Sequence, residues 1–322
     1  MGMLIDGEWI DDDEKYRNPE GGGFVRPQSS FRDRITADGS SGFPAEPGRY
    51  HLFIAPSCPW AHRTQIVRRL KGLEDAISVT LSDLPRIRSW AYSEGIDELQ
   101  PTDGVLELYD VYRAAQPDYT GRVTVPTLWD RQKKTIVNNE SSEIVRMLNT
   151  EFDAWGDASV DLYPEAHRAE IDALNERIYA TLNNGVYRCG FAKTQEAYEE
   201  TFFKLFDTLD FLDARLAKRR FLVADRPTEA DWRLFVTLIR FDFVYYSHFK
   251  CNRRRIQDYA NLWAYTLDLY QWPGIAEIVD IPAIKAGYYG SQKNVNPTGI
   301  VPVGPDIDLT RPHGRERLAE AA

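Results

Sequence analysis

Apolar positions in the first half of the chain follow two different periods. Residues 50–55, with the sequence YHLFIA, form a short β-prone run, whereas residues 60–73 carry apolar side chains at helical spacing. A second β-prone run, AISVTL, follows at residues 76–81. Because parallel strands require a long crossover connection, this order predicts a βαβ unit whose helix joins two parallel strands.

Two further strands are predicted downstream. The β-prone runs at 123–130 and 133–138 precede a helical pattern over 140–149, and strand, strand and helix complete a thioredoxin-like half. Residues 82–121 have weak periodicity and form an insertion with about one helix. Pro126 opens a strand where a thioredoxin fold has its cis proline, and backbone groups upstream of it can pair with a peptide-like ligand. The isomer itself stays open.

The second half of the chain is helical in pattern. Between Pro164 and Asp280, four stretches have helical periodicity, which indicates an all-α domain. Thr228 and Asp231 form a capping-box motif ahead of an apolar run, as at the start of a buried helix. The predicted fold class is α/β plus all-α. In chain order, we expect an extended arm over 1–48, a thioredoxin-like domain over 49–152, an all-α domain over 160–285 and a strap or tail over 286–322.

Composition restricts the partners and the compartment. The 322 residues are 43% hydrophobic, enough for one large core or two smaller ones, and the net charge of -10 disfavours nucleic acid and anionic lipid. No apolar run approaches the roughly 18 residues of a membrane span, and the acidic N-terminus is unlike a signal peptide. Three cysteines argue against a disulfide framework. We therefore expect a cytoplasmic protein without membrane or nucleic-acid partners.

Cys58 is the strongest candidate for chemistry because it lies between a β-prone run and a helix. The free N–H groups and dipole of a helix N-terminus favour thiolate over thiol, and Pro59 suits the first helical turn. The motif Cys-Pro-Trp-Ala has alanine where a dithiol enzyme has its resolving cysteine. A soluble thiol must therefore release a mixed disulfide formed on Cys58, and glutathione is the obvious candidate.

Two other interpretations of Cys58 stay open at this stage. Free cysteines are often inert core residues. A metal site with His62, four residues further on, would need additional ligands, and neither Cys189 nor Cys251 has metal-type spacing to it. We therefore predict no bound metal.

Several blocks of sequence resemble one family over most of the chain. They are APSCPWAHRT, GRVTVPTLWD followed by TIVNNESSEIVRMLN, LNNGVYRCGFA, IKAGYYGS with VNPTGIVPVGP, and the arm segment GGGFVRPQSSFRDRI. In order and spacing these blocks are similar to the glutathionyl-hydroquinone reductases, the Xi class of glutathione transferases. The resemblance implies a thioredoxin-like domain plus a helical domain, a homodimer, and reduction of glutathionyl-hydroquinones to hydroquinones with glutathione as co-substrate.

The resemblance also implies a glutathione site. Cys58 matches the family nucleophile, and Trp90 matches the tryptophan that covers the glycine or cysteinyl part of glutathione. Arg122 and Val123 match the pair ahead of the cis proline, here Pro126, where the Val123 backbone bonds to the cysteinyl moiety.

Four more residues complete the implied site. Glu140 and Ser141 match the acid and hydroxyl that hold the γ-glutamyl group, since a carboxylate can pair with its α-ammonium and a helix-start serine can donate to its α-carboxylate. Tyr187 and Tyr288 match tyrosines of the hydroquinone pocket, where phenols can donate to the leaving oxygen. Simpler roles stay open: helix capping for Glu140 and Ser141, and packing for the tyrosines and Trp90.

The chain departs from the family near its C-terminus. Ala283, Gly287 and Gln292 stand where the family often has histidines, which bears on the preferred quinone. Two rival functions use the same fold: an omega-like thioltransferase or dehydroascorbate reductase, and a noncatalytic interaction module. The intact Cys-Pro-Trp-Ala context favours an enzyme, and the two tyrosines favour a quinone conjugate over the first rival.

Overall fold

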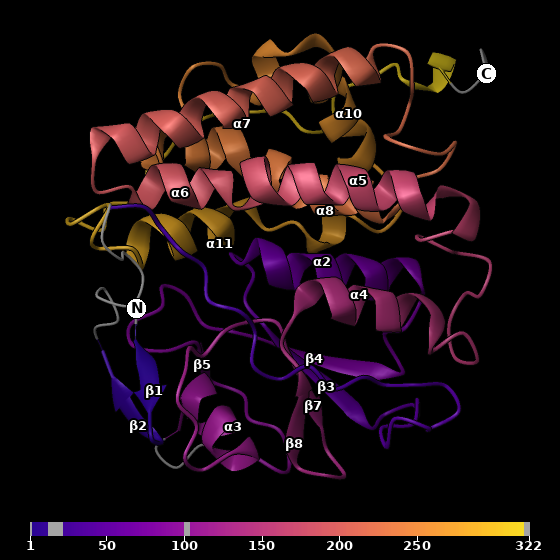
Figure 1. Ribbon diagram of the computed structural model, residues 1–322, viewed down its shortest axis with the longest axis vertical. Coiled ribbons are helices and arrows are strands. Elements are labelled where there is room, and N and C mark those ends of the chain that lie inside the picture. Colours follow the sequence, from indigo (N-terminus) through magenta and orange to yellow (C-terminus); the bar gives the residue numbers. More distant parts are fainter. Residues whose placement is uncertain (1, 12–21, 100–103, 319–322) are drawn as a thin grey trace. The chain divides into compact units, whose positions relative to one another are not determined.

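The computed structural model describes residues 2–11, 22–99 and 104–318. They form two compact units: residues 2–11 and 26–160 make the first, and residues 22–25 and 161–318 make the second. The first unit is a mixed sheet with helices, and the second is helical (Figure 1). The predicted fold class, a thioredoxin-like domain followed by an all-α domain, is therefore confirmed.

A four-stranded sheet forms the centre of the first unit. Its strands are β3 (Tyr50–Ile54), β4 (Ile77–Leu81), β7 (Thr127–Asp130) and β8 (Thr135–Asn138), in the spatial order β4-β3-β7-β8. β3 pairs in parallel with β4 and antiparallel with β7, which in turn pairs antiparallel with β8. Every residue of β3 is buried, because this strand lies inside the sheet with both faces covered.

The helix α2 (Pro59–Leu70) crosses from β3 to β4, so the predicted βαβ unit is present. It lies beside α4 (Ser141–Thr150), which follows β8 (Figure 1). Each helix buries an apolar stripe, with Ile66 on α2 and Ile144 and Leu148 on α4. This packing holds the N-terminal ends of both helices in one rigid unit.

The insertion and the proline agree with the sequence analysis. Within the described part of residues 82–121 there is one helix, α3 (Leu108–Ala115), together with the short antiparallel strands β5 (Ala91–Tyr92) and β6 (Leu106–Glu107). The Val125-Pro126 peptide bond is cis and stands directly before β7. The isomer that the sequence left open is therefore the one found in thioredoxin folds.

The N-terminal arm is more regular than predicted. We expected an extended arm over 1–48, without regular strands, but β1 (Met3–Ile5) and β2 (Glu8–Ile10) form an antiparallel hairpin. Asp6 and Gly7 in its turn have φ angles of 48° and 78°, the left-handed values that an Asp-Gly hairpin turn requires. That dipeptide is the signal that could have predicted the hairpin. Residues 12–21 of the arm lie outside the described residues.

Backbone hydrogen bonds tie the arm to the rest of the first unit. Leu4 and Gly121 exchange two bonds of 2.9 Å, so the hairpin pairs with the end of the insertion. Further along, the Asp33 N–H donates to the Val137 carbonyl at 3.0 Å, and the arm thereby pairs with β8, the edge strand of the sheet. An edge strand covered in this way offers fewer unpaired backbone groups.

Helices fill the second unit. In chain order they are α5 (Arg168–Ile178), α6 (Gly185–Phe191), α7 (Gln195–Leu216), α8 (Glu229–Arg240), α9 (Tyr246–His248), α10 (Ala260–Tyr270) and α11 (Ile281–Lys285). The described residues also form π-helical turns, η2 (Tyr179–Asn183), η3 (Phe241–Tyr245) and η6 (Ala286–Gly290), and 3-10 turns, η1 (Glu165–His167), η4 (Ile256–Asp258), η5 (Ala276–Ile278) and η7 (Glu316–Leu318). The four predicted helical stretches correspond to α5, α7, α8 and α10. None of the described helices is long and apolar enough to cross a membrane.

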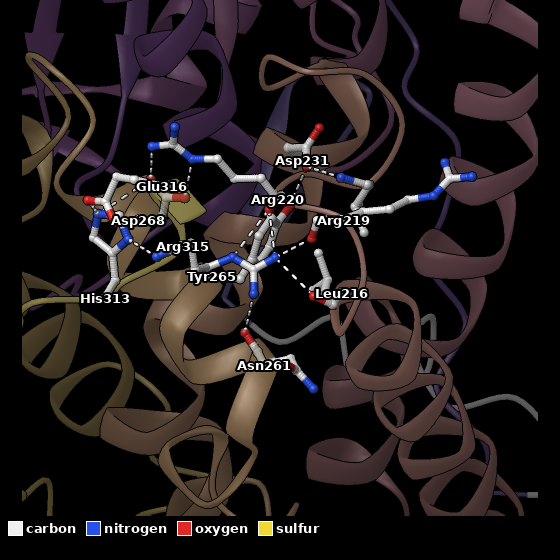
Figure 2. A network of polar contacts seen from close by, with 11 residues as sticks. Leu216, Arg219, Arg220, Asp231, Asn261, Tyr265, Asp268, His313, Arg315 and Glu316 are labelled. Carbon is white, nitrogen blue, oxygen red and sulfur yellow. Dashed lines mark hydrogen bonds and ion pairs between the residues drawn. The ribbon is translucent and has the colours of Figure 1, made fainter. Parts of the chain in front are cut away.

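The predicted capping box starts α8. The backbone N–H and the hydroxyl of Thr228 both donate to the Asp231 carboxylate at 2.8 Å. The Leu222 N–H and the Tyr265 hydroxyl reach the same carboxylate, also at 2.8 Å. Figure 2 shows Asp231 and Tyr265. Asp231 is fully buried, so these four donors take the place of water.

The C-terminal segment is an ordered strap where it meets α7. The buried Arg315 guanidinium donates to the carbonyls of Leu216 and Arg220, at 3.1 and 2.8 Å, and to that of Arg219 (Figure 2). These carbonyls lie at and just after the end of the helix, where partners inside the helix are missing. An arginine at this place also interacts favourably with the helix dipole.

Candidate functional site

Cys58 lies at the N-terminus of α2. Its backbone is extended, with φ -78° and ψ 118°, and its carbonyl accepts a helical hydrogen bond of 3.0 Å from His62, while Pro59 takes the first helical position. The residue is 9% exposed. The positive end of the helix dipole and the N–H groups of the first turn therefore adjoin the sulfur, as the sequence predicted.

The sulfur also lies beside the cis-proline loop. Cys58 Sγ donates to the Val125 carbonyl at 3.4 Å, directly before the cis bond to Pro126. The backbone of Val123 takes part in no hydrogen bond within the described residues. One backbone donor and one acceptor, two residues before the carbonyl that Cys58 contacts, are therefore available to pair with an extended peptide-like ligand.

Glu140 and Ser141 meet at the N-terminus of α4. The Glu140 carboxylate accepts from the backbone N–H and the hydroxyl of Ser142, at 3.1 and 2.9 Å, so it does cap the helix. Ser141 is buried, and Arg63 of α2 donates to its hydroxyl at 3.5 Å. Because each carboxylate oxygen can accept two hydrogen bonds, capping and ligand binding by Glu140 are compatible.

The other two predicted glutathione-binding residues, Trp90 and Arg122, have contacts of their own. Trp90 is half-buried, with the Arg86 guanidinium 4.7 Å from its ring centroid, and no hydrogen bond or ring contact in the described part of the chain links it to Glu140 or Ser141. The backbone carbonyl of Arg122 accepts from Tyr119 at 3.1 Å. The roles of Trp90 and Arg122 toward a bound thiol stay predictions.

The second unit brings the two predicted tyrosines together. The hydroxyls of Tyr187 on α6 and Tyr288 in η6 are 2.6 Å apart, and the Tyr245 hydroxyl lies 2.8 Å from that of Tyr288. All three residues are buried. Burial raises the pKa of Tyr245 and of Tyr288 well above the ordinary value, so both phenols keep their protons at neutral pH.

Sequence reasoning missed Tyr245, which lies in the aromatic run FDFVYYSHF. Its ring is stacked on Phe249 with centroids 5.6 Å apart and meets Tyr288 edge-on at 5.5 Å. Tyr245 and Tyr288 lie in the π-helical turns η3 and η6, and η2 stands shortly before Tyr187. Such turns are frequent at functional sites, but nothing in a local sequence pattern distinguishes them from ordinary helix.

The three residues that stand where the family often has histidines, Ala283, Gly287 and Gln292, all lie in the second unit. Gln292 stands within reach of His248, whose Nε2 lies 3.0 Å from the Gln292 side-chain oxygen. Ala283 is on α11, and Gly287 is buried in η6. Burial lowers the pKa of His248, so this ring favours the neutral form.

The other two cysteines have surroundings unlike those of Cys58. Cys189 and Cys251 are buried in the second unit, and neither forms a disulfide. Burial raises the pKa of the Cys251 thiol well above its usual value, which disfavours the nucleophilic thiolate. Within the described residues, no three His, Cys, Asp or Glu side chains gather as metal ligands.

Known domain families match both halves of the chain. The glutathione S-transferase N-terminal domain matches residues 57–151, and the glutathione S-transferase C-terminal domain matches residues 195–266. The chain is 53% identical over 307 residues to the glutathionyl-hydroquinone reductase PcpF of Sphingobium chlorophenolicum. This match covers 95% of this chain and 96% of that protein. It is also 48% identical over 328 residues to the glutathionyl-hydroquinone reductase YqjG of Escherichia coli (strain K12). That match covers 98% of this chain and 99% of the relative.

Solved structures give the same picture. The glutathione-bound structure of YqjG from Escherichia coli K-12 superposes with a TM-score of 0.87 at 46% identity, covering 98% of this chain and 99% of that one. The Xi-class glutathione transferase of Natrialba magadii superposes with a TM-score of 0.89, also at 46% identity. The superposition covers 98% of this chain and 97% of that one.

Proposed function

This chain belongs to the glutathionyl-hydroquinone reductases, the Xi class of the glutathione transferase superfamily, and from this premise we propose that it reduces glutathionyl-hydroquinones to hydroquinones with glutathione as co-substrate. The observation that carries the proposal is the position of Cys58 at the N-terminus of α2, with its sulfur 3.4 Å from the carbonyl that precedes cis Pro126. The helix N-terminus favours the thiolate, and the neighbouring backbone groups suit a tripeptide.

The reaction takes place in two displacements on sulfur. The Cys58 thiolate attacks the glutathione sulfur of the conjugate, a Cys58–glutathione disulfide forms, and the bond from sulfur to the aromatic carbon breaks. That carbon takes up a proton and hydroquinone leaves. A second glutathione thiolate then attacks the mixed disulfide, so Cys58 is regenerated as a thiolate and oxidised glutathione departs.

Glutathione binding is assigned along the first unit. We place the γ-glutamyl ammonium on Glu140 and its α-carboxylate on Ser141, where the N-terminus of α4 favours an anion. The backbone of Val123 pairs with the cysteinyl moiety, and Trp90 and Arg122 complete the site as the family resemblance implies. No metal takes part in this scheme.

The three tyrosines are assigned to the hydroquinone part of the substrate. Tyr187 and Tyr288 give apolar ring faces and phenol donors, and Tyr245 fixes the Tyr288 hydroxyl through the 2.8 Å contact. Because burial raises the pKa of Tyr288, its phenol is a donor and not an anion at the pH of the cell. A donor of this kind stabilises negative charge that develops on the leaving hydroquinone.

Replacing Tyr288 with phenylalanine is expected to lower kcat for a glutathionyl-hydroquinone by roughly 100-fold, the scale for loss of one donor to a developing oxyanion. The defect should be equal at about pH 7 and about pH 9, since the buried phenol stays protonated at both. Tyr289→Phe is the matched control, because Tyr289 is the buried neighbour whose hydroxyl donates to the Phe243 carbonyl. Similar losses in both variants would argue for a structural effect.

Substrate preference distinguishes the omega-like thioltransferase from the proposed reductase, and titration of the Cys58 thiol distinguishes the noncatalytic module. A chain that turns over protein mixed disulfides or dehydroascorbate faster than a glutathionyl-hydroquinone is an omega-like thioltransferase. A Cys58 pKa near 8.5, together with no glutathione adduct by mass spectrometry, would instead indicate the noncatalytic module. We further propose a homodimer in a reduced, cytoplasmic compartment, and sedimentation equilibrium checks the dimer.

A further inference from the structure

A segment of the N-terminal arm, residues 26–34, contacts Glu140 directly and is linked to Ser141 through two intermediate side chains. We assign Glu140 and Ser141 to the γ-glutamyl end of glutathione. We propose that Ser29 and Arg26 are positioning residues of the glutathione site, so that the arm takes part in thiol binding. This inference rests on the proposed function, because it takes Glu140 and Ser141 as the γ-glutamyl ligands.

Ser29 holds the carboxylate of Glu140 from the arm side. Its hydroxyl donates to Glu140 Oε2 at 3.0 Å and lies 3.2 Å from the Asn139 carbonyl. The other oxygen, Oε1, accepts from Ser142. Each carboxylate oxygen thus has a protein donor, which fixes the plane of the group before a ligand arrives, and Oε2, with a single donor, keeps a lone pair for an ammonium. A preorganised acceptor loses less freedom when it binds.

The arm segment itself is anchored where it passes Glu140. Phe31 donates through its N–H to the Asn139 side-chain oxygen, and the Asn139 N–H donates back to the Phe31 carbonyl, both at 3.1 Å. Arg32 Nε donates to Glu143 at 2.7 Å. Together with the pairing of Asp33 on β8, these contacts fix the backbone within four residues of Ser29. The Ser29 hydroxyl is therefore held in place and does not sample solvent freely.

Arg26 supports Ser141 through two intermediate side chains. Its guanidinium lies 4.8 Å from the ring centroid of Trp60, and the Arg63 guanidinium lies 4.5 Å from the same centroid. Arg63 in turn donates to the Ser141 hydroxyl at 3.5 Å. Guanidinium groups are attracted to an indole face, so the arm steadies the arginine that orients Ser141.

The test measures binding of S-methylglutathione, which cannot react, by calorimetry. Ser29→Ala is expected to raise its Kd about 3- to 10-fold, the range for one intramolecular hydrogen bond. Ser29→Thr keeps the hydroxyl and should restore binding to within about 2-fold of wild type. Ser40→Ala is the matched control, since Ser40 lies in the same arm and bonds to Asp38, away from Glu140.

A second probe separates positioning from general structural damage. S-methyl glutaryl-cysteinylglycine lacks the α-ammonium, so the ratio of Kd between Ser29→Ala and wild type should fall to about one. An unchanged ratio with this probe, or equal binding of S-methylglutathione by Ser29→Ala and wild type, overturns the role of Ser29. If wild type itself does not bind S-methylglutathione, the proposed function fails, which is a different outcome.

Arg26→Ala tests the series of contacts that leads from Arg26 through Trp60 and Arg63 to Ser141. The substitution is expected to lower the affinity for S-methylglutathione about 2- to 5-fold. Because these contacts act on Ser141 and hence on the α-carboxylate, the same loss should be found with S-methyl glutaryl-cysteinylglycine, which lacks the ammonium. Arg34→Ala is its control, being an exposed arginine of the same arm. Equal affinities for the Arg26 and Arg34 variants would overturn the role of Arg26.

Discussion

Replacing Cys58 with alanine is expected to lower turnover of a glutathionyl-hydroquinone at least about 1000-fold. The substitution removes the attacking sulfur, and no other group takes over a covalent displacement, so only binding without chemistry is left. The measurement is the rate of hydroquinone release, with the product identified by mass spectrometry. Wild type exposed to the conjugate without free glutathione should carry one glutathione on Cys58, and Cys58→Ala should carry none.

The matched control for this experiment is Cys251→Ala. Cys251 is fully buried, and its raised pKa disfavours the thiolate, so its loss should leave turnover within about 2-fold of wild type. Equal rates for Cys58→Ala and wild type would end the mechanism. An adduct found on Cys251 in place of Cys58 would assign the nucleophile to the second unit.

Replacing Asp231 with alanine is expected to lower the free energy of unfolding by about 3–5 kcal/mol, because four buried donors lose one charged acceptor. Those donors are the N–H of Leu222, the N–H and hydroxyl of Thr228, and the hydroxyl of Tyr265. Denaturant-induced unfolding followed by circular dichroism gives the value, provided that the transition is reversible.

Two variants calibrate this prediction. Asp207→Ala removes an exposed carboxylate from α7 and should change stability by less than about 0.5 kcal/mol. Asp231→Asn keeps one acceptor oxygen but brings an NH2 group toward other donors, so its stability should lie between those of Asp231→Ala and wild type. A loss below about 1 kcal/mol for Asp231→Ala would mean that relaxation or water satisfies the donors.

Local patterns were sufficient for the parts of the fold that short segments encode. The alternation of β-prone and helical runs predicted the βαβ unit, and Thr228 with Asp231 predicted the start of α8. The position of Cys58 also followed, because a strand, a Cys-Pro step and a helix in succession leave the sulfur at a helix N-terminus. The Asp6-Gly7 hairpin was readable as well, but its strands are too short for a clear alternation.

Contacts between distant segments could not be predicted in this way. Ser29 and Glu140 are 111 positions apart, and Tyr245 and Tyr288 are 43 apart. Nothing in the surroundings of either residue in the sequence specifies such a partner, since tertiary packing brings them together. The resemblance to a family supplied Tyr187 and Tyr288, but neither pattern nor resemblance indicated Tyr245.

The π-helical turn η2 can absorb the loss of one residue without changing the phase of α6. A π turn closes its hydrogen bonds over five residues, so it accommodates one residue more than an α turn. Deleting one residue from Tyr179–Asn183 would let α5 continue as a regular helix, with α6 at nearly the same rotation about its axis. A deletion between the start of α6 and Tyr187 would instead turn Tyr187 by about 100° and break its 2.6 Å contact with Tyr288. Single-residue deletions in η2 should therefore be far milder for the phenol cluster than deletions in the first turn of α6.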